Sequence, residues 1–248
     1  MKTLKFLSIA IGMLLATLSF NSCLDDNDGY SLDNFVLSVA SVKTKGGSAP
    51  FFRLDNGKTL WPAAGQINAS ILKDNQRVLL NYTLLGDSTT GAVGFDYYIR
   101  INGIDTLLTK PIVENLAAKN DSVYGTDPVR IVNMWTGNGH LTVDFEANFG
   151  NKRAHLINLV ATDWEKTPYT LEFRQNAFDD PQITRAKGLV CFDLSKLPAQ
   201  LDKDSILLTI RVNTFDGLKE YAVKYNPTDR SSQGQAIHLN RSVMDWIN

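Results

Sequence analysis

The sequence is poor in cysteine and has no excess of charge of either sign. Its two cysteines, Cys23 and Cys191, cannot build the disulfide framework of a small secreted domain. Twenty-five Lys and Arg residues stand against 26 Asp and Glu residues, so the formal net charge is -1 and a globally basic nucleic-acid-binding protein is excluded. Since 44% of the residues are hydrophobic, the chain has enough apolar side chains for one large or two small domains.

The sequence also lacks the short motifs that accompany common chemistry. It contains no Gly-x-Ser-x-Gly nucleophile elbow and no Walker phosphate loop. The three histidines, His140, His155 and His238, are far apart and lack the spacing of a zinc site. An EF-hand beginning at Leu24 would lack its opening Asp and, at Phe35, its closing Glu. We therefore predict no catalytic residue, no cofactor and no metal site.

The N-terminus has the pattern of an export signal. Lys2 and Lys5 precede an apolar run from Phe6 to Phe20, which is shorter than the roughly 20 residues that span a bilayer. Ser22 lies directly before Cys23, as a lipoprotein signal peptidase requires, so we predict a signal peptide over residues 1–22 and a lipid on Cys23. Plain secretion without a lipid is the alternative.

Residues 23–33 are short, polar and acidic, which is typical of a solvated tether. This segment resembles the acidic stretch that directs lipoproteins of Bacteroidetes to the cell surface. The expected location is therefore the outer membrane with the protein exposed at the cell surface, and a periplasm-facing lipoprotein is the alternative.

Beyond the tether the pattern is β almost throughout. Apolar and β-branched runs predict strands in the first half at residues 35–42, 50–54, 77–84, 95–101 and 104–110. Asn56-Gly57 and Asn102-Gly103 each predict a tight hairpin turn. After a polar stretch, further strands are predicted at 129–135, 141–149, 156–161, 169–174, 189–194, 206–215 and 220–225. Evenly spaced strands without amphipathic helices favour a sandwich over a parallel α/β sheet.

Several segments together resemble one family, the NigD-like lipoproteins of Bacteroidetes. The segments are Phe51–Pro62, Gln76–Tyr82, Tyr97–Asn102, Leu107–Lys110, Trp135–Phe145, His155–Val160, Leu171–Asn176 and Cys191–Leu194. The resemblance implies an all-β protein with an N-terminal OB-type barrel followed by a C-terminal immunoglobulin-like β-sandwich. We place the barrel at residues 34–114, a linker at 115–128 and the sandwich at 129–248. Gln175 departs from the family pattern, which leads us to expect a histidine there.

Aromatic residues of the barrel are the best candidates for binding. OB barrels often hold extended polymers across one face, where aromatic rings stack on bases or sugars. Phe52, Tyr82 and Tyr97 are expected to fill the core, whereas Tyr98 has the opposite parity to Tyr97 and Trp61 precedes a proline. We therefore select Trp61 and Tyr98 as possible ligand-binding residues.

Two other features have plain structural interpretations. Asp144 and Glu146 share the polar face of one alternating strand, where we expect them to be solvated. Cys191 lies in an apolar run and is expected to be a small buried hydrophobic residue.

Three functional hypotheses follow. The first is a non-enzymatic, lipid-anchored binding or protective protein, similar to a bacteriocin-immunity protein, whose partner is an envelope protein, a toxin or a glycan rather than a nucleic acid. The second is a glycan-binding or glycan-active protein, with Asp144 and Glu146 as its carboxylate pair if it is a hydrolase. The third is a structural subunit of an outer-membrane complex.

Overall fold

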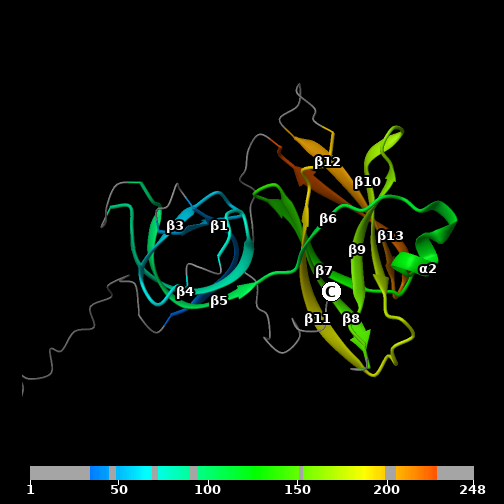
Figure 1. The fold of residues 1–248 in the computed structure, drawn as a ribbon, viewed down its shortest axis with the longest axis horizontal. Coiled ribbons are helices and arrows are strands. Elements are labelled where there is room, and N and C mark those ends of the chain that lie inside the picture. The colour runs from blue at the N-terminus through cyan, green and yellow to red at the C-terminus, as the bar shows by residue number, and fades with distance from the viewer. Residues whose placement is uncertain are drawn as a thin grey trace, which may run out of the picture. The chain divides into compact units, whose positions relative to one another are not determined.

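The chain folds almost entirely into β-strands in a computed structural model that describes residues 34–44, 49–68, 72–89, 94–150, 153–198 and 205–227. The first five strands are β1 (Val36–Lys43), β2 (Phe51–Leu54), β3 (Thr59–Ala64), β4 (Arg77–Asp87) and β5 (Tyr97–Thr106). They form a closed barrel in the order β1-β2-β3-β5-β4, in which β3 and β5 run parallel (Figure 1). A closed five-stranded barrel with this order is the OB architecture, so the predicted barrel is confirmed.

The remaining strands form two four-stranded sheets. One sheet has the order β6-β11-β8-β7 and the other the order β13-β12-β10-β9 (Figure 1). Their bounds are β6 (Thr109–Pro111), β7 (Arg130–Gly137), β8 (His140–Phe149), β9 (Leu156–Asp163), β10 (Thr167–Asn176), β11 (Thr184–Asp193), β12 (Ile206–Thr214) and β13 (Gly217–Tyr225). The predicted β-sandwich is thereby confirmed.

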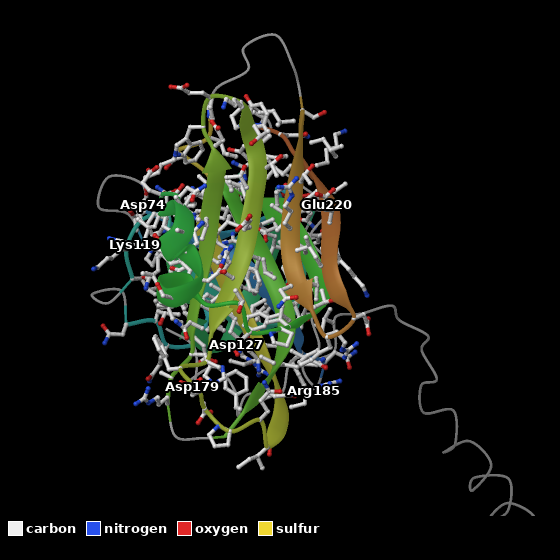
Figure 2. All side chains as sticks on the ribbon, turned by 90° about the vertical axis from the view of Figure 1, so that its right-hand side faces the viewer. Asp74, Lys119, Asp127, Asp179, Arg185 and Glu220 are labelled. Carbon is white, nitrogen blue, oxygen red and sulfur yellow. The ribbon has the colours of Figure 1, made fainter. Side chains whose placement is uncertain are left out.

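Two separate hydrophobic cores fill the barrel and the sandwich. The barrel core includes Phe52, Leu60 and Tyr82, and the sandwich core includes Phe145, Phe173 and Phe192. Figure 2 shows charged side chains such as Lys119 and Glu220 on the outside of the sandwich, where both are exposed. Burial of alternate side chains on paired strands is therefore what holds each domain together.

The strand pairing changes from barrel to sandwich between Thr106 and Thr109. Strand β6 pairs in parallel with β11, so it belongs to the sandwich, whereas the sequence placed the domain boundary at residue 114. The segment interpreted as a linker contains a 3-10 helix, η2 (Ala117–Lys119), and a short helix, α2 (Asn120–Tyr124). The Tyr124 hydroxyl donates to the carbonyl oxygen of Glu114 at 3.1 Å, which ties this segment into an ordered turn.

Of the two predicted tight turns, one forms and the other does not. Gly57 has φ 86° in the β2–β3 turn. A further tight turn joins β7 to β8, where Asn138 and Gly139 have φ 52° and 81°, as an Asn-Gly hairpin requires. The hairpin predicted at Asn102-Gly103 is wrong, because β5 continues through both residues. Asn81 pairs with Gly103 and Tyr82 with Ile101, so Asn102 is the extra residue of a β-bulge.

Candidate functional site

Four half-buried aromatic side chains gather on the outside of the barrel. Trp61 of β3 and Tyr98 of β5 are register partners, and Phe51 of β2 lies one position along from the Phe52–Leu60 pair, beside Trp61. The ring of Phe95 contacts two of the others, with centroids 5.2 Å from Phe51 and 4.8 Å from Trp61. We call Phe51, Trp61, Phe95 and Tyr98 the aromatic face. The structure thus brings together both residues selected from the sequence.

A network around Asp96 fixes the position of Phe95. The Asp96 carboxylate accepts hydrogen bonds from the Thr59 backbone N–H at 2.8 Å, the Thr59 hydroxyl at 2.9 Å and the Lys58 ammonium at 2.9 Å. The Asp96 backbone N–H donates to the Thr59 carbonyl at 3.1 Å. These donors hold the pKa of Asp96 below its ordinary value although burial opposes the charge. Phe95 is therefore held against β3 by its neighbour in the chain.

The three barrel aromatics that were expected to fill the core point inward, as predicted. Phe52 and Tyr82 belong to the barrel core, and Tyr97 packs against it. Sequence reasoning did not select Phe51 or Phe95. The parity of β2 could have shown that Phe51 points outward, because Phe52 points inward, but no local signal places Phe95.

A buried polar cluster joins the barrel to the sandwich. The guanidinium of Arg77 (β4) is fully buried and donates two hydrogen bonds of 2.6 Å to the carboxylate of Asp55, which lies in the β2–β3 turn. From the sandwich, the Trp135 indole N–H donates to Asp55 at 2.8 Å, and Asn138 Nδ2 donates to it at 3.1 Å. Arg77 in turn donates to the Thr142 hydroxyl at 3.1 Å. We call these five residues the interdomain cluster.

This cluster is a buried ion pair in which both carboxylate oxygens of Asp55 accept hydrogen bonds, whereas Arg77 Nε has no partner among the described residues. Burial disfavours the charged guanidinium, but the Asp55 carboxylate outweighs it and raises the pKa of Arg77 above its ordinary value. Cys191 is fully buried beside it, as predicted, and burial raises the pKa of its thiol. Apolar residues complete the interface: Val39, Leu79 and Leu107 on one side pack with Trp135, Leu189 and Cys191 on the other.

The expectation that Asp144 and Glu146 are solvated is wrong. Asp144 is 4% exposed and Glu146 is 9% exposed. The reason is that their side of β8 faces the barrel: Leu189, the register partner of Asp144, packs in the interface with Val39 and Leu79.

The two carboxylates lie in different environments. Burial raises the pKa of Asp144, whose Oδ1 atom has no hydrogen-bond partner among the described residues. Glu146 forms an ion pair with Arg130 at 2.6 Å. A carboxyl group with a raised pKa beside an ion-paired carboxylate resembles an acid–base pair, but the domain interface covers its side of the sheet.

The described histidines make ordinary hydrogen bonds. His155 is fully buried, stacks on Phe149 at 4.2 Å, and lies between Gln175 at 2.9 Å and Asp180 at 3.2 Å. His140 contacts the carbonyl oxygen of Asn138 at 3.0 Å. Gln175, where the resemblance led us to expect a histidine, is thus a partner of His155. In the part of the chain that the structure describes, no group of three or more His, Cys, Asp or Glu residues could hold a metal ion.

The predictions about the anchor concern another part of the chain. The signal peptide (1–22), Cys23 and the whole tether (23–33) lie outside the described residues, as does His238. Within the described ranges, no helix is long and apolar enough to cross a membrane.

The fold and its surfaces define a class of two-domain β protein, in which a small OB barrel packs on a β-sandwich. Residues 39–107 match the NigD-like N-terminal OB domain, and residues 111–225 match the NigD-like C-terminal beta sandwich domain. The chain therefore belongs to the NigD-like family. A comparison with curated proteins found no match.

Solved structures support the same assignment. A putative toxin-related protein from Parabacteroides distasonis is 45% identical with a TM-score of 0.69, and the match covers 79% of this chain and 96% of that one. A protein of unknown function from Bacteroides vulgatus is 27% identical with a TM-score of 0.67, and the match covers 87% of this chain and 100% of that one. A NigD-like immunity protein from Bacteroides caccae shares the fold at 19% identity and a TM-score of 0.57, with coverage of 80% and 99%.

Proposed function

We propose that this chain is a non-enzymatic, lipid-anchored protein of the cell envelope that binds a partner protein through its aromatic face and protects the cell. The aromatic face is the observation that carries the proposal. Trp61 and Tyr98 are residue types that dominate the binding energy of protein interfaces, and Phe51 and Phe95 enlarge the apolar area around them.

Preorganisation supports the binding role. The four rings are half-buried, so each retains surface that a partner can cover, and the contacts of Asp96 hold Phe95 in place before binding. A rigid aromatic surface loses little conformational entropy on association, which favours affinity. Because β3 and β5 each pair with a neighbouring strand on both sides in the closed barrel, the backbone beneath the aromatic face is also rigid.

The protective role is motivated by the relatives. The 45% identical protein from Parabacteroides distasonis is described as toxin-related, and a more distant protein with the same fold is described as a NigD-like immunity protein. A toxin-like protein is therefore the partner that we propose for the aromatic face.

The experiment is a challenge of deletion cells with bacteriocins from neighbouring strains. We expect increased sensitivity to at least one bacteriocin, rescue by the wild-type gene, and no rescue by Trp61→Ala. Loss of a central interface tryptophan typically costs about 2 kcal/mol or more, which is roughly a 30-fold loss of affinity.

Phe215→Ala is the matched control, since Phe215 is a 37% exposed aromatic residue on the sandwich, and it should rescue fully. Unchanged sensitivity of the deletion strain to every bacteriocin would contradict the protective role. Equal rescue by Trp61→Ala would contradict the role of the aromatic face.

The anchor is tested separately with Cys23→Ser. We expect the wild-type chain to sediment with membranes and to be cleaved by protease added to intact cells, and we expect the variant to be lost from the membrane fraction. A variant that still sediments would overturn the lipid anchor. Protection of the wild-type chain from protease would indicate the periplasm-facing alternative.

A further inference from the structure

A polar groove lies where the barrel meets the sandwich. It is lined by the end of β1 and the turn at residues 73–76 on the barrel, and by the β7–β8 turn and the ends of β11 and β13 on the sandwich. Its volume is about 620 Å³, which is within the range of small-molecule sites. The proposed function does not use this groove.

His140 places an unused hydrogen-bond acceptor in the groove wall. The residue is 9% exposed, and its Nδ1 atom lies 3.0 Å from the carbonyl oxygen of Asn138. A carbonyl oxygen only accepts, so Nδ1 carries the proton in this contact. Burial and the nearby Arg77 charge lower the pKa of His140, which favours the neutral imidazole. Its Nε2 lone pair is therefore an acceptor, and no described residue donates to it.

Two asparagine side chains beside His140 also have unused acceptors. Asn138 Nδ2 donates to the carbonyl oxygens of Arg53 and Leu54 at 3.2 Å each and to Asp55, which fixes the orientation of the amide. The Asn138 Oδ1 atom consequently points elsewhere, and it has no partner among the described residues. The same is true of Asn226 Oδ1. Both residues line the groove, although both oxygen atoms are buried in its wall. Unsatisfied acceptors at a site favour a ligand that is rich in donors.

The charges of the groove are balanced. Two cationic side chains, Lys43 and Lys73, face two carboxylates, Asp74 and Asp193. Both carboxylates already accept backbone hydrogen bonds of 2.8 Å, Asp74 from Thr44 and Asp193 from Ser195. With His140 neutral the lining carries no net charge, so it favours neither an anionic nor a cationic ligand.

We propose that this groove binds an uncharged, hydroxyl-rich ligand, namely a short neutral oligosaccharide. Hydroxyl groups of such a ligand donate to His140 Nε2. They also accept hydrogen bonds from the hydroxyl of Ser195, which lines the same wall. Tyr225 adds an aromatic ring with a polar end to the lining, which suits the mixed polar and apolar surface of a sugar.

The test is titration calorimetry on the full-length, detergent-solubilised chain. The probes are neutral trisaccharides built from glucose, mannose, xylose or N-acetylglucosamine, with trigalacturonate and a neutral tripeptide as the acidic and peptide arms. We expect at least one neutral trisaccharide to bind with a Kd of about 1 mM or tighter. Binding of trigalacturonate or the tripeptide alone would overturn the proposal, as would no binding by any neutral sugar.

Variants then locate the site. His140→Phe removes the acceptor and should weaken binding at least 10-fold, whereas His140→Gln, which keeps an acceptor, should retain part of the affinity. Ser195→Ala, a substitution of an exposed residue, should weaken binding without affecting folding. Trp61→Ala should leave sugar binding unchanged, so failure here and failure of the aromatic-face proposal are distinguishable. Full affinity in both His140→Phe and Ser195→Ala would place the sugar elsewhere and refute the assignment.

One further binding experiment distinguishes two sources of the ligand, the end of a larger glycan and a free oligosaccharide. The same trisaccharide immobilised through its reducing end should still retain the chain if the groove holds a glycan terminus. Binding of the free sugar alone would restrict the ligand to soluble oligosaccharides.

Discussion

Removing the Asp55 carboxylate should destabilise the whole chain, because Asp55 connects the two domains. Asp55→Ala leaves the guanidinium of Arg77 fully buried without a counter-charge, and it deprives the Trp135 indole of its acceptor. Breaking a buried ion pair by removing one partner costs about 3–5 kcal/mol. For a chain of this size we therefore expect Tm to fall by about 6–20 °C.

A double-mutant cycle separates the ion pair from the rest of the interface. Replacing both partners, in Asp55→Ala with Arg77→Met, removes the uncompensated charge and should restore part of the lost stability. Urea denaturation at pH 7 and 25 °C, followed by circular dichroism, gives the free energy of unfolding of each variant.

Glu220→Ala provides the matched control. Its ion pair with Arg211 has a similar separation of 2.9 Å, but both side chains are exposed, so its loss should change stability by less than about 1 kcal/mol. If Asp55→Ala costs no more than Glu220→Ala, the guanidinium reaches solvent and the buried interface described above does not form. If the double variant is less stable than Asp55→Ala, the uncompensated charge of Arg77 is not the cause of the lost stability, and the reasoning is refuted.

Three further predictions follow from the same interface. Gly137→Ala would place a Cβ atom 2.4 Å from the Asp55 side chain and should lower stability by about 1–3 kcal/mol, whereas Gly103→Ala, with its nearest atom at 3.9 Å, should have little effect. Asp144→Asn should raise Tm at pH 7, because burial raises the pKa of Asp144 and its ionisation therefore disfavours the folded state; the gain should vanish in titrations below the ordinary carboxyl pKa of 3.8. In a Cys23→Ser background, maleimide should label Cys191 only as urea unfolds the chain, since the thiol is fully buried; labelling of the native chain would show that the interface opens.

Much of the strand pattern was predictable because hydrophobic alternation follows directly from the geometry of a strand. The residues of β8 from Leu141 to Phe149 alternate as the sequence indicates, and the odd-numbered side chains enter the sandwich core. The turn at Asn102-Gly103 was not predictable in the same way. A dipeptide that favours a hairpin becomes a bulge when the flanking residues keep pairing with one long neighbour, here β4.

The candidate binding residues were partly predictable for a similar reason. Successive residues of a strand point to opposite sides, so Tyr98 points outward where Tyr97 points inward. The parallel pairing of β3 with β5 then places Trp61 beside Tyr98. Phe95 precedes β5, and its position depends on the hydrogen bonds that Thr59, 37 residues away in the sequence, donates to the Asp96 carboxylate. Contacts of that kind carry no local signal in a single sequence.

The interface between barrel and sandwich could not be predicted from the sequence, because the sheet that contains β8 is buried on both of its sides. Polar residues on alternate positions of β8 indicate a solvated side when the strand is considered alone, yet Thr142, Asp144 and Glu146 are all buried. The barrel packs on this side of the sheet around Trp135 and Leu189, where Asp55 and Arg77 supply hydrogen-bond partners for Trp135 and Thr142. A sandwich produced without the barrel would expose Trp135 and Leu189 and leave the Trp135 indole without its acceptor. The polar alternation that suggests an independent sandwich therefore belongs to the surface on which the barrel packs.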